Sequence, residues 1–345
     1  MLSNLGSKIK ERLKKVSLIK LLKAYFKNIH TGYQTYKGYI ETFGDDNTLL
    51  FCPWHGTGDI ILIGRYLYYY LEQENIKNYV FLFRGNAERA AGKIYPYLLQ
   101  NEKNGILCDD CIDDFVRFCT FIGMENCKVK SLHHASVIPQ ITCTDPFSGY
   151  NGISMKSMYI YATMNLKEEP SPRKAEFVRN NAVCLSYFEL NYLIPGKTVI
   201  LAPYSVSAKE TPMDLWKHLA SKLVYMGYSV CTNCSSKTET LPYTTPIFFD
   251  FLDAENFVEK AGYFIGWRSG LCDVIAGAEC KKVVLYPYNT VFCQSGRAIA
   301  YTGINELGLC NDAVQIEYIC QDRRELIDQI LNELHLVEDS KEERG

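Results

Sequence analysis

The sequence predicts an α/β protein built from two Rossmann-like parallel-sheet domains that face a central cleft, with a basic amphipathic helix at the N-terminus. Apolar strand patterns alternate with helical patterns from residue 48 onward, and the alternation restarts after a proline-containing segment near residue 170. The chain has 345 residues, more than the roughly 250 to 300 at which a single hydrophobic core stops growing. Because alternating strands and helices form parallel sheets covered on both faces, ligands are expected beyond the carboxyl ends of the strands.

The first domain is predicted from short apolar runs separated by segments of helical periodicity. TLLFC is the first buried-strand pattern, and DIILIGRYLYYYLEQEN follows it as the first helix. Strands are expected at residues 48–52, 79–83, 105–108 and 128–132, and helices at residues 59–75, 86–99 and 111–123.

A charged segment at residues 166–180, which contains Pro170 and Pro172, marks the predicted domain boundary and leads into a connecting helix. Beyond it, strands are expected at 198–204, 228–232, 263–267 and 281–287, and helices at 213–227, 253–262, 269–279 and 323–337. The predicted organisation is an N-terminal segment (1–40), a first Rossmann-like domain (41–168), a linker helix (169–196), a second Rossmann-like domain (197–314) and a C-terminal helix with a charged tail (315–345).

The charge of the chain is unevenly distributed. Residues 1–40 hold nine Lys or Arg and one acid, whereas the other 305 residues hold 28 basic and 38 acidic residues. An acidic body argues against a nucleic acid as the main partner. In the basic segment, one helical face carries Leu2, Leu5, Ile9, Leu13 and Val16, and beyond Ser17 the apolar stripe moves to Leu18, Leu22, Tyr25, Phe26 and Ile29. Two interpretations stay open for residues 1–28: a helix on an anionic membrane surface, or a helix packed on the body.

The 14 cysteines are expected to be mostly free thiols. The N-terminus lacks an apolar stretch long enough for a signal peptide, and no segment reaches the roughly 18 residues of a membrane span. The sequence therefore predicts a cytoplasmic protein, peripheral on the inner face of the cell membrane if the basic segment binds lipid. A competing hypothesis is a zinc site made by two CxxC pairs, Cys108 with Cys111 and Cys231 with Cys234. His133 and His134 lie near the first pair in sequence. Because the pairs fall in different predicted domains, no metal is expected.

The loop after the first body strand carries the first candidate site. Gly58 and Asp59 open a predicted helix, directly after His55 and Thr57. An ionised carboxylate at a helix N-terminus can accept a proton from a substrate hydroxyl, and the helix dipole favours the ionised form. His55 is the rival base, and a plain N-cap role for Asp59 is the simpler alternative.

Two loops of the second domain carry candidate phosphate ligands. The loop from Tyr204 and Ser205 to Lys209 offers hydroxyls, amides and one ammonium group. After the strand YFIGW, Arg268 is followed by a predicted helix start with free backbone amides at Ser269, Gly270 and Leu271, and then by Asp273. Such a helix start favours an anion, and a guanidinium group suits a diphosphate.

These three loops together resemble the bacterial heptosyltransferases, which are GT-B glycosyltransferases of family 9. Gly58-Asp59 matches the family's early glycine-aspartate loop, and the stretch from Lys209 to Trp216 loosely matches its lysine loop. The stretch from Arg268 to Asp273 matches in part a strand-end motif of the form Asp-Ser/Thr-Gly-Leu/Pro-x-His. This chain departs from that motif, because Arg268 stands where the family has an acid and Asp273 stands where it has a histidine.

The resemblance implies that residues 41–168 form an acceptor domain and residues 197–314 a nucleotide-sugar domain. It implies that Asp59 is the base of an inverting, metal-independent sugar transfer in cell-surface polysaccharide synthesis. Lys209, Arg268, Ser269, Gly270 and Leu271 would hold the donor phosphates. Thr57, Gly58, Tyr204, Ser205 and Asp273 would contact donor or acceptor. The reversed charges leave the donor open, and two alternatives remain: a pyruvyl- or phosphoryl-transferring enzyme on the same scaffold, and a non-catalytic nucleotide- or glycan-binding protein.

Overall fold

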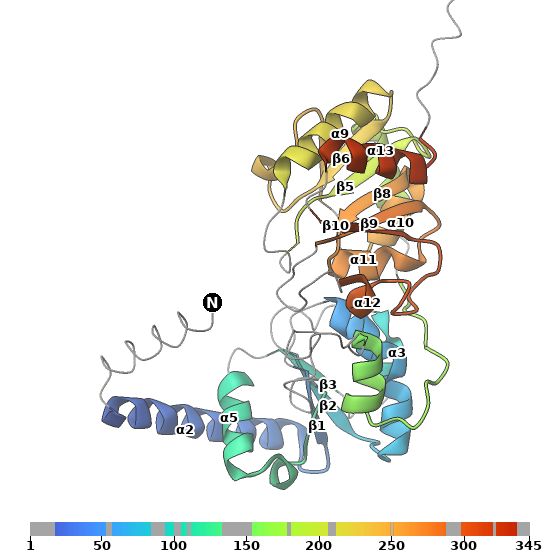
Figure 1. The fold of residues 1–345 in the computed structure, drawn as a ribbon. Coiled ribbons are helices and arrows are strands. Elements are labelled where there is room, and N and C mark those ends of the chain that lie inside the picture. Colours follow the sequence, from blue (N-terminus) through green and yellow to red (C-terminus); the bar gives the residue numbers. More distant parts are fainter. Residues whose placement is uncertain are drawn as a thin grey trace, which may run out of the picture. The chain divides into compact units, whose positions relative to one another are not determined.

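The computed structural model describes residues 18–52, 57–83, 94–99, 105–108, 112–132, 154–177, 181–205, 212–248, 250, 252–287, 298–319 and 322–336. The chain divides into two compact units. The first comprises residues 1–55, 75–88 and 97–133, and the second comprises residues 56–74, 89–96 and 134–345. Figure 1 shows the elements of both units along the chain. None of the described helices is long and apolar enough to cross a membrane.

The first unit contains a four-stranded parallel sheet of order β3-β2-β1-β4. Its strands are β1 (Thr48–Cys52), β2 (Tyr79–Phe83), β3 (Gly105–Cys108) and β4 (Val129–Ser131). Its helices are α2 (Leu18–Phe43), α5 (Ile112–Ile122) and the 3₁₀ helix η2 (Met124–Cys127), and the short η1 (Pro96–Leu99) spans the division between units. All four strands confirm the sequence prediction.

Helix α2 packs on α5 through a close approach at Gly32. A Cβ atom at Gly32 would lie 1.9 Å from the carbonyl oxygen of Asp114, so the two backbones leave no room for a side chain. The rings of Tyr36 and Tyr39 pack on Phe115 just beyond this point, with centroids 6.5 and 5.3 Å apart. The apolar stripe of α2 therefore packs on α5 over the C-terminal half of the helix.

The second unit is built on a six-stranded parallel sheet of order β10-β9-β8-β5-β6-β7. The strands are β5 (Thr198–Ala202), β6 (Ser229–Asn233), β7 (Thr245–Ile247), β8 (Gly262–Trp267), β9 (Lys281–Pro287) and β10 (Val314–Tyr318). Every residue of β5 is buried, as expected for a central strand covered on both faces. The chain runs outward from β5 through β6 to β7, then returns to β8 and runs outward on the other side.

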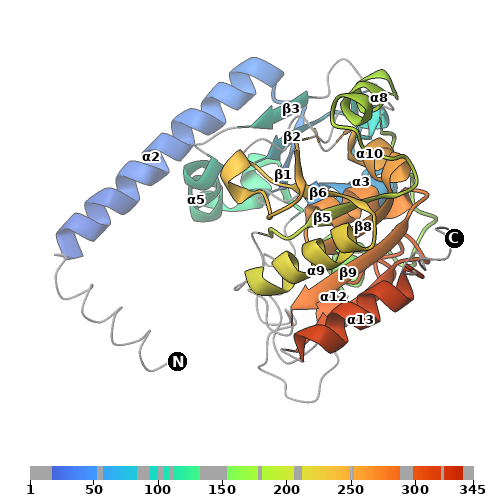
Figure 2. The same ribbon diagram turned by 90° about the horizontal axis from the view of Figure 1, so that it is seen from above.

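Helices cover both faces of this sheet. One core cluster joins α9 (Met213–Tyr225) and α13 (Arg323–Glu333) to alternate residues of β5, β8 and β9, and the two helices lie on the same face (Figure 2). Helix α10 (Ala254–Ala261) packs on β5 and β8 and contacts α8 (Asn181–Leu190) and α11 (Gly270–Val274), and α12 (Ala298–Thr302) packs on β9 and β10. Helix α3 (Thr57–Gln73) groups with this unit and packs on α11.

The remaining short elements are α7 (Met155–Ser157), the π-helix η3 (Met158–Thr163) and the 3₁₀ helices η4 (Lys237–Glu239) and η5 (Ile275–Gly277). The sequence analysis did not predict β7, β10, α7, η3 or α12. Strand β7 and helices α7 and α12 are short and η3 is a π-helix, whereas β10 (VQIEY) was missed although its apolar and polar residues alternate regularly. The helix predicted at 269–279 is α11 followed by η5. The predicted helix 86–99 lies mostly outside the described residues.

Candidate active site

The candidate site lies at the point where the strand order of the second unit reverses. Strands β5 and β8 are neighbours, but the chain leaves them in opposite directions across the sheet. Parallel sheets bind ligands beyond the carboxyl ends of strands at such a point. The loops that follow these strands meet here, because the hydroxyl of Ser205 donates a 2.8 Å hydrogen bond to the carbonyl oxygen of Arg268. The sequence motifs of these two loops are thus brought together.

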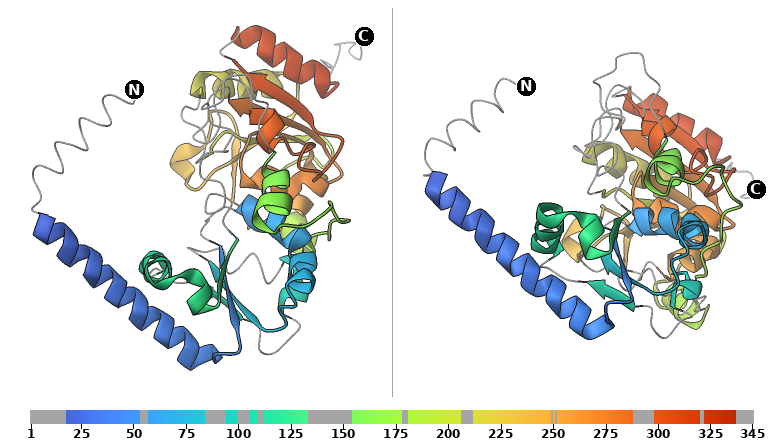
Figure 3. Two further views of the ribbon diagram at one scale, coloured as in Figure 1. Left: turned by 60° about the horizontal axis from the view of Figure 1, so that its bottom comes forward. Right: turned by 90° about the horizontal axis from the view of Figure 1, so that it is seen from below.

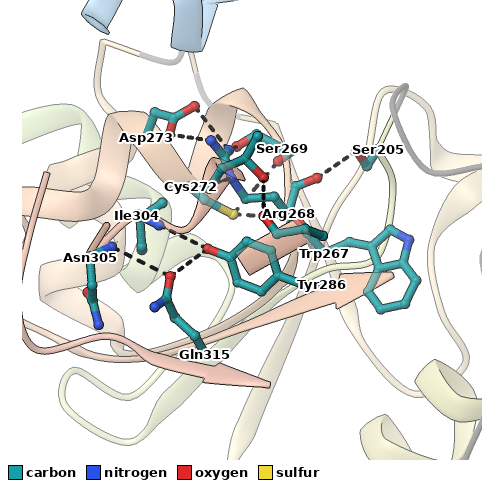
Figure 4. A network of polar contacts seen from close by, with 12 residues as sticks. Ser205, Trp267, Arg268, Ser269, Cys272, Asp273, Tyr286, Ile304, Asn305 and Gln315 are labelled. Atoms are coloured by element: carbon teal, nitrogen blue, oxygen red, sulfur yellow. Dashed lines mark hydrogen bonds and ion pairs between the residues drawn. The ribbon is translucent and has the colours of Figure 1, made fainter. Parts of the chain in front are cut away.

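The guanidinium group of Arg268 is held by the protein itself (Figure 4). Nη1 and Nη2 contact the two carboxylate oxygens of Asp273 at 3.0 and 2.8 Å. Nε donates to the carbonyl oxygen of Thr302 at 2.7 Å, and Nη1 also donates to that of Ser269 at 2.5 Å. The side chains of Arg268 and Asp273 are only 12% and 4% exposed. Most donors of the guanidinium group are therefore engaged within the unit.

Burial and pairing act in opposite directions on the charges of this ion pair. Burial raises the pKa of Asp273, whereas the charge and hydrogen bond of Arg268 lower it. Burial by itself would lower the pKa of Arg268. The negative charge of Asp273 is the largest of the effects that together raise this pKa by more than burial lowers it, so the pKa of Arg268 lies above its ordinary value. Arg268 is therefore positively charged at neutral pH.

Asp59 lies in the first turn of α3 and faces this ion pair. Tyr159, a buried residue of the π-helix η3, donates a hydrogen bond of 2.9 Å from its hydroxyl to Oδ1 of Asp59. The neighbouring Gly58 sits directly against Asp273, since a Cβ atom there would lie 2.1 Å from Oδ2 of Asp273. The start of α3 and the start of α11 are thus in direct contact, and their two carboxylates influence each other.

The environment of Asp59 suits a group that exchanges a proton near neutral pH. Burial raises the pKa of Asp59 to about 7, and the negative charge of Asp273 adds to this effect. The hydrogen bond from Tyr159 and the charge of Arg268 act in the opposite direction. A carboxyl group with a pKa near the working pH is well matched to general acid–base catalysis.

The other predicted site residues fall into four groups. Ser269 is the N-cap residue of α11, and Gly270 and Leu271 are its first two residues. Because α11 has five residues, the helix dipole behind these amides is weaker than that of a full-length helix. Tyr204 turns toward η4, where its hydroxyl donates to the carbonyl oxygen of Glu239 at 2.5 Å. Thr57 begins α3. His55 and Lys209 lie outside the described residues.

The sequence analysis missed Tyr159 and Thr302. Tyr159 belongs to MYIYAT, whose residues form a π-helix rather than a regular helix, and this segment lies 100 residues beyond Asp59 along the chain. π-helical turns occur frequently at functional sites, but they leave no periodic signal in a sequence. Thr302 contributes only its backbone carbonyl group, which no side-chain motif reveals.

The zinc hypothesis gains no support from the part of the chain that the structure describes. There, no three His, Cys, Asp or Glu side chains gather as a metal site would require. Cys231 and Cys234 are buried, and the thiol of Cys234 donates to the carbonyl oxygen of Thr232 at 3.4 Å. Burial raises the pKa of Cys231 to about 12, which disfavours the thiolate that zinc needs. Cys111, His133 and His134 lie outside the described residues.

Known proteins resemble this chain in fold rather than in sequence. No protein-family model matches it, and no curated protein does. A glycosyl transferase family 9 structure from Veillonella parvula matches with a TM-score of 0.50 and 13% identity, over 82% of this chain and 88% of that one. The E. coli ADP-heptose LPS heptosyltransferase II matches with a TM-score of 0.52 and 14% identity, over 84% of this chain and 98% of that one.

These likenesses confirm the predicted fold class. The chain is an α/β protein with two Rossmann-like parallel sheets, which is the architecture of the GT-B glycosyltransferases. Within that class, its fold resembles that of the family 9 glycosyltransferases, the group that includes the heptosyltransferases.

Proposed function

We propose that the protein is a glycosyltransferase that moves a sugar from a nucleotide-sugar donor to a glycan or lipid-linked acceptor in bacterial cell-surface polysaccharide synthesis. The observation that carries the proposal is the placement of Asp59. Its carboxylate, with a pKa raised to about 7, faces the strand-order switch point of a GT-B fold. A proton acceptor beside a crevice for a nucleotide is the minimum that sugar transfer to a hydroxyl group requires.

In the proposed reaction, Asp59 accepts the proton of an acceptor hydroxyl as that oxygen attacks the anomeric carbon of the donor. The bond from that carbon to the nucleoside diphosphate breaks on the opposite side, so the configuration of the sugar inverts. Tyr159 holds the Asp59 side chain through its hydrogen bond to Oδ1. Because Oδ1 is engaged with Tyr159, Oδ2 is the oxygen proposed to take the proton.

The leaving diphosphate is proposed to contact the amides of Ser269, Gly270 and Leu271 together with Lys209. The sequence analysis assigned Arg268 to phosphate binding, whereas in this proposal Arg268 mainly supports a loop of the site. Its guanidinium group pairs with Asp273 and with two carbonyl oxygens, so it supports the loop after β8 rather than gripping phosphate with a free fork. Its positive charge still favours a nearby anion. We propose transfer without a metal ion.

Two measurements test this function. The first is a thermal-shift screen of the intact chain against UDP, GDP, ADP, CMP and dTDP sugars, in which a ligand at 100 times its dissociation constant adds about 2.7 kcal/mol of stability. The second is a transfer assay with the donor so identified, run with and without EDTA, with NMR of the product's anomeric configuration. Asp59→Asn should lower turnover at least ~100-fold and leave donor affinity nearly unchanged.

Four results would contradict the proposal or one part of it. Full turnover by the Asp59→Asn variant would remove the base assignment. Binding of a nucleotide sugar without any turnover would favour a binding protein. Transfer of a pyruvyl or phosphoryl group instead of the sugar would place the chain in another class of transferase. Loss of activity in EDTA would contradict the metal-independent mechanism alone.

A further inference from the structure

The apolar stripe of α2 is exposed in the first turns of the helix and packs on α5 from Ile29 onward. From Ile29 onward the stripe packs on α5, where Ile29 is 8% and Tyr39 is 5% exposed, although Tyr33 between them is 42% exposed. In the N-terminal half, Leu22, Tyr25 and Phe26 are 47%, 46% and 56% exposed. Figure 3 shows the first turns of α2 extending beyond α5 in both views. The exposed side chains continue the stripe that α5 buries further along the helix.

The polar face of the same turns is basic. Lys20, Lys23 and Lys27 are exposed. At about 100° per residue, Lys20 and Lys27 fall opposite the stripe formed by Leu22, Tyr25 and Phe26, and Lys23 falls on its flank. The range from residue 18 to residue 40 contains no Asp or Glu. The preceding 17 residues add five basic side chains and one acid. The exposed first turns of α2 therefore combine a face of aromatic and aliphatic side chains with a polar face on which all charged residues are lysines.

We propose that the N-terminal half of α2 docks on an anionic lipid surface. A helix with Leu and aromatic residues on one face and lysines on the other lies in the plane of a membrane interface, where the apolar face enters the acyl boundary and the ammonium groups reach the headgroups. Tyr25 and Phe26 pack edge to face, with ring centroids 5.8 Å apart, and present a compact aromatic surface of the kind that prefers the interface. This docking is independent of the proposed enzymatic function.

Charge distinguishes this occupant from the alternatives. A second copy of the same helix, packed stripe to stripe, would leave both sets of lysines without acidic partners, because residues 18–40 contain no Asp or Glu. An uncharged apolar protein groove would leave the lysines without counter-charges. An anionic bilayer can bury the apolar face of the helix and pair the lysines with its headgroups at the same time. Each lysine near the bilayer surface strengthens association roughly fivefold. The lipid surface is therefore the occupant that the residues favour.

The test is co-sedimentation of the intact chain with vesicles of phosphatidylcholine alone and of phosphatidylcholine with 30 mol% phosphatidylglycerol. Binding is expected for the anionic vesicles and should weaken as salt increases. The variant Lys20→Gln/Lys23→Gln/Lys27→Gln should lower the affinity roughly 100-fold. Its matched control is Lys167→Gln/Lys174→Gln/Lys237→Gln, which removes the same charge from exposed positions of the second unit and should bind as the unaltered chain does.

A second pair of variants tests the apolar face. Leu22→Ser/Phe26→Ser should reduce binding at least tenfold, whereas Leu190→Ser/Tyr225→Ser removes apolar residues that are 78% and 76% exposed on other helices and should not. Both variants leave the contacts of Gly32 and Tyr36 with α5 intact, and circular dichroism checks that α2 still folds. Equal binding to the two kinds of vesicle, or equal losses in the test and control variants, would overturn the proposal. So would a change of oligomeric state, measured by light scattering without lipid, in the Leu22/Phe26 variant alone, since it would make the stripe a contact between copies of the chain.

Discussion

The hydroxyl of Tyr159 donates a 2.9 Å hydrogen bond to Oδ1 of Asp59, across 100 residues of sequence. Tyr159 is completely buried, so its ring has a fixed position from which to orient the carboxylate. The bond stabilises the ionised form of Asp59, while burial and Asp273 stabilise the protonated form. The pKa of Asp59 near 7 therefore results from burial and Asp273, which raise it, and from Tyr159, which lowers it. Substitutions at Asp273 and Tyr159 can alter these effects separately.

The first prediction concerns the pH dependence of activity. A base must be ionised, so turnover should rise with pH and reach half its maximum near pH 7. Tyr159→Phe removes a hydrogen bond that favours the carboxylate, and the midpoint should move to higher pH. Steady-state kinetics from pH 5.5 to 9 would measure this. The loss in the variant should be large at pH 6.5 and shrink at pH 9. An equal loss at every pH would mean that Tyr159 has only a packing role.

The second prediction concerns stability. The folded-state pKa of Asp59 is about 7 and its ordinary value is 3.8, so the folded protein holds this proton more tightly than the unfolded chain. The resulting stabilisation is fully present below about pH 4 and is lost as the pH rises through 7. Asp59→Asn removes the charge that must be buried above pH 7. The variant should be more stable than the unaltered chain at pH 8, by on the order of 1 to 3 kcal/mol, and this difference should be smaller at pH 5.

Thermal unfolding at the two pH values measures this difference. Asp273→Asn is not a suitable control, because Asp273 pairs with Arg268. Asp214→Asn serves better, since Asp214 is exposed on α9 and its replacement should change stability little at either pH. A destabilised Asp59→Asn variant at pH 8 would contradict the raised pKa. That result would say nothing about the role of Asp59 in turnover, which the transfer assay measures separately.

The parallel sheets were predictable because their strands are short runs of buried apolar residues with turn residues on both sides, as TLLFC and TVILA show. The turns that lead from such strands into helices, among them those that hold Asp59 and Arg268, were predictable for the same reason. The pairing of Arg268 with Asp273 was not predicted, since a sequence shows charges but not which of them become buried together. Tyr159 was missed because a π-helix has no period that a sequence pattern can show. Strand β7 has three residues and is specified by its neighbour β6 rather than by its own composition.

The third prediction concerns the buried ion pair. Replacing one partner leaves the other as an unpaired charge in a site where the side chains are 12% and 4% exposed. Arg268→Leu alone or Asp273→Leu alone should therefore lower the free energy of unfolding by about 3 to 5 kcal/mol. The double variant should lose less than either single one, because it buries no charge. Urea titration of the four proteins gives the coupling energy. Additive losses would show that the two side chains do not depend on each other.

The fourth prediction concerns the contact between Gly58 and Asp273. In Gly58→Ala, the new methyl carbon would lie 2.1 Å from Oδ2 and 3.1 Å from Cγ of Asp273, well inside van der Waals contact. Asp273 is held by Arg268 and cannot move away without weakening the ion pair. The substitution should therefore destabilise the protein by about 1 to 3 kcal/mol and also lower turnover, because Asp59 is the next residue.

Gly38→Ala is the matched control for this substitution. Gly38 lies within α2, and a Cβ atom there would meet nothing within 4 Å, so alanine should stabilise the helix by about 0.5 to 1 kcal/mol. The two variants make the same chemical change and should shift the melting temperature in opposite directions. The double variant Gly58→Ala/Asp273→Ala removes the carboxylate with which the new methyl group would clash. If the clash is the cause, the two changes together should cost less than the sum of their separate effects. Strict additivity would place the cause of any Gly58→Ala defect elsewhere in the turn that opens α3.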